Sequence, residues 1–478
     1  MQAAPRYFSS NAGILGTQRL EALVSRGETV SLAEAILLGQ APDGGLLMPD
    51  HIPKIDGTII KKMRGWGHKR IFVEVMMPYF AGTLPRKTLE RIAQEAYTFK
   101  PFIEPIGLDY IDRLDNGPTA SFKDFGLQAQ RRFIEALRKD ESLLTIITST
   151  SGDTGGAVAA AYHGMKGVWV VILYPAGKIS DLQAKQMDTL GGNICVMAVE
   201  NTNFDGCQKL ALQLQRDPDL HDIKKTSANS VNIGRFLPQI AYYFHAYSKV
   251  ARPNEEVYFA VPSGNFGNAD AGVFARRAGL SIKLIIAVNE NDVFKRFHDT
   301  GVYKPASEAV PCPSSAMEVN LPSNMRRLFQ LYGGQLIGER EVKVMPDMDQ
   351  LKREIAAAYS ISNDDTDRAV KGFYDEWHMI GTTHSTLEPH GAVAWEAAKR
   401  FRADTGYNGK IIVFETAHPG KFPESLIKQG ITDVELPDCL ARLVHIPHGF
   451  YHAMPNDYGV IKSKIRELHA REVARLRI

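Results

Sequence analysis

Uninterrupted runs of apolar residues, each leading into small or polar residues and then a helical pattern, constrain the fold of this chain most strongly. The runs are LLTIIT at 143–148, GVWVVILYP at 167–175, VYFAVP at 257–262, KLIIAV at 283–288 and KIIVFET at 410–416. Strands that are apolar at nearly every position are typical of sheets buried on both faces. Strand, loop and helix in succession predict parallel sheets with right-handed crossovers. We therefore expect an α/β protein that binds its ligands at the carboxyl ends of the strands.

The same pattern divides the 478 residues into four parts, in keeping with two or three domains for this length. Residues 1–105 include helical stretches such as LAEAILLG at 32–39 and predict a mainly helical N-terminal domain. Residues 106–250 and 251–437 hold the apolar runs and predict two α/β domains, each with a parallel sheet. Residues 438–478 are expected to form a C-terminal tail packed on the core.

Charge and cysteine content argue against several classes of function. The chain has 56 basic and 54 acidic residues, a net charge of +2, so no strong field attracts nucleic acid or an anionic membrane. No apolar run approaches the ~20 residues that span a bilayer. The four cysteines form no CxxC pair, which favours a reducing compartment and predicts no zinc site. We expect a cytoplasmic monomer or homodimer that acts on a small molecule.

The segment SGNFGN at 263–268 directly follows one apolar run and precedes a helical pattern. Its glycines allow positive φ and a close approach of the backbone to a ligand. The following helix offers free N–H groups and the positive end of its dipole. The sequence therefore predicts a phosphate cradle, although glycine-rich turns without a ligand also occur and the segment matches neither a P-loop nor GxGxxG.

The segment STSGDTGG at 149–156 has the same placement after a strand. The hydroxyls of Ser151 and Thr154 suit a carboxylate or a second anion. Asp153 would repel such an anion, and its alternative role is to cap the following helix.

Lys123 lies in the segment NGPTASFKDFGLQ at 116–128, where a helix is expected to begin. Ser121 would cap this helix, with Asp124 completing a partial capping box. Apolar neighbours and the helix N-terminus both disfavour an ammonium group and lower its pKa, as an amine that forms a Schiff base requires. The alternative is a surface lysine paired with Asp124. The helical spacing predicts a buried stripe of Phe122, Phe125, Ala129 and Phe133.

Two further segments carry polar side chains in close spacing. NSVNIGR at 229–235 offers Asn229, Ser230 and Arg235, which suit a substrate phosphate, or else form an ordinary loop with a salt-bridged arginine. HGFYH at 448–452 spaces two histidines by four, but the neighbouring prolines argue against a helical metal site. We expect no metal.

The lysine, the phosphate cradle and the hydroxyl-rich loop are together the parts needed to hold pyridoxal phosphate and an amino acid. Thr416, which ends the run at 410–416, could then face the pyridine nitrogen, or merely cap the helix after AHPGKF.

The motifs resemble those of the threonine synthase family in its longer bacterial and fungal form. The resemblance rests on eight motifs in the family's order, GGLLMP, GPTASFKDF, TSTSGDTGGAVA, ILYPAGKISDLQ, NSVNIGR, VPSGNFGN, EPHGAVAW and ETAHPGKF. It implies the tryptophan-synthase-β-like fold, also called pyridoxal-phosphate fold type II, with an extra N-terminal domain. It also implies the last step of threonine biosynthesis, in which O-phospho-L-homoserine and water give L-threonine and phosphate.

The resemblance also implies roles for individual residues. Lys123 would bind the cofactor covalently and act as the catalytic base. Thr416 would meet the ring nitrogen, and Asp153 takes the place near the 3-oxygen where many relatives of this fold have asparagine. The cofactor phosphate would be held by Gly264, Asn265, Phe266, Gly267 and Asn268. The substrate carboxylate would be held by Ser151 and Thr154, and its phosphate by Asn229, Ser230 and Arg235.

The lysine segment departs from the family pattern, and two other functions remain open. The family commonly has His-Gly before the Pro-Thr of this segment and Leu-Ala after it, whereas this chain has Asn116-Gly117 and Ala120-Ser121. One alternative is a pyridoxal-phosphate phospholyase that releases 2-oxobutyrate from phosphohomoserine or phosphothreonine. The other is a non-catalytic regulatory module that binds a small molecule.

Overall fold

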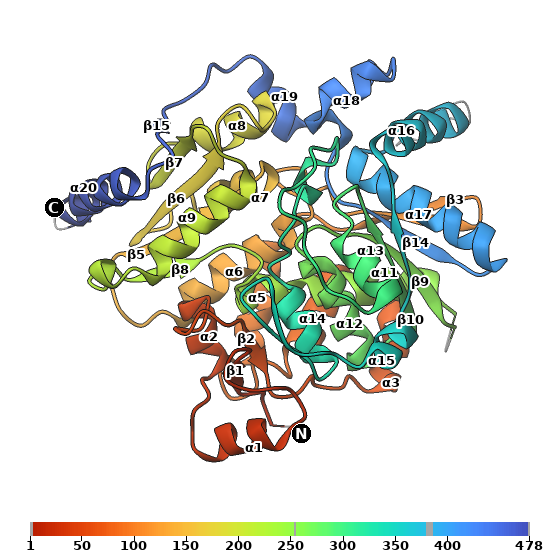
Figure 1. The fold of residues 1–478 in the computed structure, drawn as a ribbon, viewed down its shortest axis with the longest axis horizontal. Helices are drawn as coiled ribbons and strands as arrows, with labels where there is room; N and C mark the ends of the chain where they lie inside the picture. Colours follow the sequence, from red (N-terminus) through yellow and green to blue (C-terminus); the bar gives the residue numbers. More distant parts are fainter. Residues whose placement is uncertain (1–2, 253–254, 379–385, 477–478) are drawn as a thin grey trace.

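Two β-sheets, which contain all five predicted apolar runs, form the framework of the protein (Figure 1). The computed structural model describes residues 3–252, 255–378 and 386–476. Helices pack around both sheets, and the N-terminal segment lies along one side of the molecule (Figure 1). The expected α/β class with parallel sheets is confirmed.

The smaller sheet has five strands, all parallel, in the order β15-β7-β6-β5-β8. Every residue of β5 and β6 is buried, as their uninterrupted apolar runs predict. Every residue of β7, which was not among the predicted runs, is buried as well. In chain order the strands are β5 (Leu144–Ser149), β6 (Val168–Pro175), β7 (Ile194–Val199), β8 (Lys225–Ser227) and β15 (His452–Met454). The helices interspersed with them are α6 (Lys123–Leu137), α7 (Asp153–Tyr162), α8 (Asp181–Asp188) and α9 (Phe204–Arg216).

The larger sheet has six strands in the order β13-β10-β9-β14-β4-β3, parallel except for the β3–β4 pair. Its strands are β3 (Phe102–Ile106), β4 (Asp109–Arg113), β9 (Val257–Pro262), β10 (Ile282–Val288), β13 (Ile355–Ser360) and β14 (Ile411–Glu415). Between β8 and β14 the chain also forms α10 (Ile233–Phe236), α11 (Ile240–Val250), α12 (Gly267–Ala278), α13 (Val293–Thr300), α14 (Met325–Leu331), α15 (Met348–Glu354), α16 (Asn363–His378), α17 (Pro389–Thr405) and the short pair β11 (Gln335–Ile337) and β12 (Glu341–Val344).

Sheet membership does not follow the expected boundary between residues 105 and 106. Strand β4 pairs with β14, so residues that precede the lysine segment belong to the larger sheet. Strand β15, which lies in the C-terminal part of the chain, pairs with β7 and so belongs to the smaller sheet. That part also contains α18 (Pro423–Lys428), α19 (Asp438–Val444) and α20 (Tyr458–Leu476).

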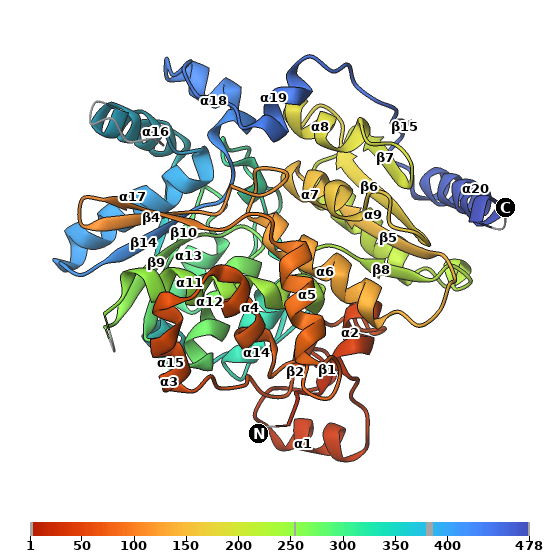
Figure 2. The ribbon, with the colours of Figure 1, turned by 180° about the vertical axis from the view of Figure 1, so that it is seen from behind.

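The N-terminal part is mainly helical, as expected, with one short antiparallel strand pair. Helix α4 packs against α11, and α5 packs against α6, so this part contacts elements associated with both sheets. Figure 2 shows α3, α4 and α5 in front of these elements. The elements are β1 (Tyr7–Ser9), α1 (Gln18–Ser25), α2 (Leu32–Leu38), β2 (Leu47–Pro49), α3 (Gly57–Lys62), α4 (His68–Met76) and α5 (Arg86–Ala96).

The hydrophobic core consists of three clusters. The most extensive one joins the N-terminal helices to one side of both sheets, and the other two cover the remaining sides. In the described ranges, no helix combines the length and the apolar character that crossing a membrane requires.

Candidate active site

A cavity lies where the carboxyl ends of β5, β9 and β14 meet, at the place expected for a ligand in a parallel sheet. It is lined by residues from segments far apart in the sequence. All the predicted site residues except Asp153 line it: Lys123, Ser151, Thr154, Asn229, Ser230, Arg235, Gly264, Asn265, Phe266, Gly267, Asn268 and Thr416.

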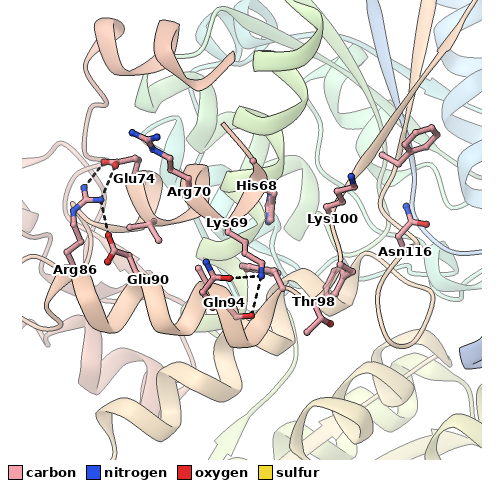
Figure 3. A pocket seen from close by; sticks show the side chains of 16 residues that line it. His68, Lys69, Arg70, Glu74, Arg86, Glu90, Gln94, Thr98, Lys100 and Asn116 are labelled. Carbon is pink, nitrogen blue, oxygen red and sulfur yellow. Dashed lines mark hydrogen bonds and ion pairs between the residues drawn. The ribbon is translucent and has the colours of Figure 1, made fainter. Parts of the chain in front are cut away.

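Chemistry rather than size identifies this cavity as the candidate site. Its volume is about 90 Å³, whereas an open groove between α4, α5 and the following segment has about 1100 Å³ (Figure 3). In that groove Arg86 is paired with Glu74 and Lys69 with Gln94, and none of the predicted site residues lines it (Figure 3).

Lys123 is the first residue of α6, in the first turn as predicted, but the helix cap differs from the expectation. The N-cap is Phe122, which makes no side-chain cap hydrogen bond, and Ser121 Oγ accepts from the Lys123 N–H at 3.4 Å. Asp124 instead accepts hydrogen bonds from the backbone and the hydroxyl of Thr119, both at 2.9 Å. The predicted capping box of Ser121 and Asp124 is therefore wrong, and so is the predicted pairing of Lys123 with Asp124, because the Thr119 turn occupies this carboxylate.

Lys123 is paired with Asp153 instead. Its Nζ lies 3.1 Å from Asp153 Oδ2, and the lysine side chain is 10% exposed. The other oxygen, Oδ1, lies 2.7 Å from Lys421 Nζ and accepts a hydrogen bond from Gln183 Nε2 at 2.9 Å. The alternative role of Asp153 as a helix cap is wrong, because Asp153 is the first residue of α7 and the hydroxyl of Thr150 accepts a hydrogen bond from the N–H of Gly155 in the first turn at 2.8 Å.

Burial and neighbouring charges shift the pKa values of this cluster. Burial lowers the pKa of Lys123; Asp153 opposes this shift, and Lys421 and Arg235 reinforce it. Burial alone would raise the pKa of Asp153, but the positive charges of Lys123 and Lys421 outweigh burial and hold this pKa below its usual range. The lowered pKa of Lys123 agrees with the expectation for a nucleophilic amine.

The segment 263–268 connects β9 to α12 as predicted and has unusual local geometry. Phe266 adopts a left-handed conformation with φ of 66° at the start of the helix. Gly264 is needed for close packing, because a Cβ there would lie 2.8 Å from Cα of Met317. No side chain caps α12, which leaves the N–H groups of its first turn available to an anion.

Asn268 adds a donor to this cradle. Its Oδ1 accepts hydrogen bonds from the hydroxyls of Tyr242 at 2.7 Å and Tyr243 at 3.0 Å. Its Nδ2 is buried and has no hydrogen-bond partner among the residues that the structure describes. A buried donor without a partner is costly, and a phosphate oxygen would satisfy it.

Arg235 brings a positive charge to the predicted site. Its guanidinium donates to the carbonyl of Ala228 at 2.7 Å and to Thr154 Oγ1 at 3.3 Å. Within the described ranges no carboxylate lies at ion-pair distance from it, so the alternative of a salt-bridged arginine is wrong. Burial lowers the pKa of Arg235 to about 10, which leaves it charged at neutral pH.

Ser230 and Asn229, the other two residues predicted to bind the substrate phosphate, differ in how many of their hydrogen-bonding groups are already used within the protein. Ser230 Oγ accepts from Asn324 Nδ2 at 2.8 Å and keeps its own proton available. Asn229 binds the end of β5, because its Oδ1 accepts from Thr148 and its Nδ2 donates to the carbonyl of Ser149.

Thr416 follows β14 directly and lines the cavity. Its hydroxyl donates a hydrogen bond to Glu388 Oε1 at 3.1 Å. The helix after AHPGKF is α18, and its N-cap is Phe422, so Thr416 is not the cap that the sequence allowed. Glu388 also accepts a hydrogen bond from the His390 backbone, and His390 Nε2 accepts one from the Ala316 N–H at 2.9 Å.

Sequence reasoning did not select four residues that support the site: Gln183, Glu388, His390 and Lys421. All four belong to the motifs: Gln183 ends ILYPAGKISDLQ, and Glu388, His390 and Lys421 lie in EPHGAVAW and ETAHPGKF. The motifs indicated their importance without indicating their contacts. His448 of the HGFYH segment contacts the carboxylates of Asp181 and Asp188. In the described part of the chain, no group of three or more His, Cys, Asp or Glu residues is arranged so that it could hold a metal ion.

Comparison with known families gives three matches that follow one another along the chain. Residues 24–97 match the family described as threonine synthase N terminus. Residues 110–416 match the family of pyridoxal-phosphate dependent enzymes. Residues 391–465 match the family described as threonine synthase, C-terminal.

Individual relatives are similar over nearly their whole length. Threonine synthase of Haemophilus influenzae is 35% identical over 91% of this chain and 96% of its own. That of Escherichia coli is 34% identical over 93% of this chain and 98% of its own. The crystal structure of the Escherichia coli enzyme has a TM-score of 0.83 at 30% identity, covering 97% of this chain and 99% of that chain. The yeast enzyme has a TM-score of 0.84 at 28% identity, covering 98% of this chain and 100% of that chain.

Proposed function

The chain belongs to the threonine synthase family of pyridoxal-phosphate-dependent lyases, and from this premise we propose which of its residues bind the cofactor and the substrate. Pyridoxal phosphate is its cofactor. The proposed reaction converts O-phospho-L-homoserine and water into L-threonine and phosphate.

The residues of the cavity suit this cofactor. Lys123 offers a largely buried amine for covalent attachment. Thr416 would contact the ring nitrogen. Asp153 does not line the cavity itself but is paired with Lys123, and it would lie beside the 3-oxygen. The segment 264–268 would hold the phosphate, which the unpaired Nδ2 of Asn268 and the start of α12 support. When bound, pyridoxal phosphate supplies an electron sink that stabilises negative charge on the substrate.

The remaining polar residues are proposed to bind the two anionic ends of the substrate. Ser151 and Thr154 would receive the carboxylate. Asn229, Ser230 and Arg235 would receive the phosphate. The observation that favours this assignment is the positive charge of Arg235, which lines the cavity and has no acidic partner in the part of the chain that the structure describes.

Lys123 is proposed as the base. Its lowered pKa increases the fraction of uncharged amine near neutral pH, and such an amine can remove the proton from Cα of the substrate. Loss of a proton from Cβ then allows the bond between Cγ and the ester oxygen to break. Arg235 stabilises the charge that develops on the departing phosphate. Water adds its hydroxyl at Cβ, and protons return to Cα and Cγ, which completes L-threonine.

The single observation that carries this proposal is that Lys123 at the start of α6 and the cradle at 263–268 line one cavity, although they belong to opposite halves of the molecule. The test is to incubate the purified holoenzyme with O-phospho-L-homoserine and to quantify threonine, phosphate and 2-oxobutyrate. Threonine and phosphate in equal amounts are expected, with no product from Lys123→Ala. If 2-oxobutyrate is the main product, the chain is a phospholyase and the proposal is wrong.

A further inference from the structure

Lys421 is a second buried lysine next to the proposed catalytic residue. It belongs to the short helix Pro419–Lys421, and its side chain is fully buried. Its Nζ lies 2.7 Å from Asp153 Oδ1 and donates to the carbonyl of Thr119 at 3.0 Å. Like Asp153, Lys421 does not line the cavity.

Asp153 is therefore shared by the side chains of two lysines. Lys123 lies 3.1 Å from one carboxylate oxygen and Lys421 lies 2.7 Å from the other. The proposed function requires Lys123 to act as an uncharged amine, and Lys421 is then the cation that remains paired with Asp153. Arg235 and His390 also influence the pair of Lys123 and Asp153. Asp124 and Cys439 are further titratable groups that interact with Lys421.

The contact with Lys421 explains how an aspartate can occupy position 153 beside the cofactor. An unpaired carboxylate beside the 3-oxygen of the cofactor would repel that oxygen, which carries negative charge. A carboxylate whose charge is balanced by a buried ammonium group does not bring a net charge to the site. The pair of Asp153 and Lys421 can thus occupy the place where relatives of this fold have a neutral asparagine.

We propose that Lys421 is a positioning residue that balances the charge of Asp153 and thereby keeps the amine of Lys123 uncharged. This inference rests on the proposed role of Lys123. Without Lys421, Asp153 would have Lys123 as its remaining ammonium partner, and the ammonium form of Lys123 would become more stable. The lysine would then bind the cofactor only at higher pH.

A second mutation that removes the charge of Asp153 distinguishes this role of Lys421 from a merely structural one. The variants are Lys421→Met, Asp153→Asn and the double variant, with Lys421→Arg as the variant that retains the charge. Each is prepared as the full-length apoprotein, and its uptake of pyridoxal phosphate is followed by visible absorbance between pH 6 and pH 10. This readout does not depend on turnover.

Lys421→Met is expected to raise the midpoint pH of cofactor uptake by about one unit or more, which weakens uptake near neutrality about tenfold. The double variant is expected to return the midpoint to the wild-type value or below it, because it removes both charges together. Lys421→Arg is expected to remain closer to wild type than Lys421→Met.

The proposal is overturned if the double variant binds the cofactor no better than Lys421→Met, since Lys421 would then serve packing rather than charge. If Lys421→Met does not fold, a folded double variant still supports the proposal, and a double variant that also fails to fold overturns it. A wild-type protein that binds the cofactor but makes no threonine would refute the proposed reaction and leave this test intact.

Discussion

Arg235 and Thr154 are joined directly, because Nη2 of the arginine donates a hydrogen bond to Oγ1 of the threonine at 3.3 Å. The contact connects the segment proposed for the substrate phosphate to the segment proposed for its carboxylate. One guanidinium can thus fix the distance between the two anionic ends of the bound substrate.

Arg235→Gln is expected to lower kcat/KM for O-phospho-L-homoserine about 10- to 100-fold, because a hydrogen bond to a charged group contributes about 1.5–3 kcal/mol. Inhibition by inorganic phosphate should weaken in parallel, and both are measured in steady-state assays. Cofactor binding should be nearly unchanged. Unchanged phosphate inhibition in the variant would remove Arg235 from the phosphate site.

Asn268→Ala is expected to weaken binding of pyridoxal phosphate about tenfold, because it removes the buried amide donor of the proposed cradle. Asn268→Asp has nearly the same shape but places a carboxylate against the cofactor phosphate, so it should bind more weakly still. Both affinities are measured by titration of the apoprotein. An aspartate variant that binds as tightly as wild type would contradict the cradle.

Gly264→Ala is expected to destabilise the protein by about 1–3 kcal/mol, because the new Cβ would meet backbone atoms of Ala316 and Met317 at 2.8–2.9 Å. Gly372→Ala is the matched control, since Gly372 lies in α16, is exposed and would meet nothing within 4 Å. The control should be neutral or more stable by up to about 1 kcal/mol. Denaturant unfolding compares the two, and equal midpoints would contradict the close packing at Gly264.

The pH dependence of turnover should follow the amine of Lys123. Its pKa lies below the ordinary lysine value of 10.5, so kcat/KM should rise with pH and level off below that value. Asp153 stabilises the ammonium form, so Asp153→Asn should move the midpoint of this rise to lower pH. A midpoint that moves upward in the variant would mean that Asp153 does not face this amine as an ion-pair partner.

Five strands of the two main sheets follow from the sequence, because an uninterrupted apolar run is a local pattern. Strands β5, β6, β9, β10 and β14 coincide with the predicted apolar runs within one residue at each end. Strand β4 was not predicted, because its sequence DYIDR carries charges that are unusual in a buried strand. Asp112 within it is fully buried, and burial raises its pKa well above the usual value.

The contacts of the site depend on tertiary structure and were predictable only in part. The sequence predicted which residues line the cavity, from the hydroxyls and glycines that follow strands and from Lys123 at the start of a helix. The partner of Lys123 was not predictable from its neighbours in the sequence. The adjacent Asp124 accepts a hydrogen bond from Thr119, whereas the carboxylate that pairs with Lys123 belongs to Asp153 at the start of α7. Lys421 comes from a segment after the last strand of the larger sheet, and no local pattern relates it to Asp153.

The most direct test of the account asks which lysine carries the cofactor. The purified holoenzyme is treated with borohydride to fix the bound pyridoxal phosphate, digested, and analysed by peptide mass spectrometry. The account predicts the label on Lys123 and none on Lys421, although both amines contact the same carboxylate. Label on Lys421 or on any other lysine would contradict it.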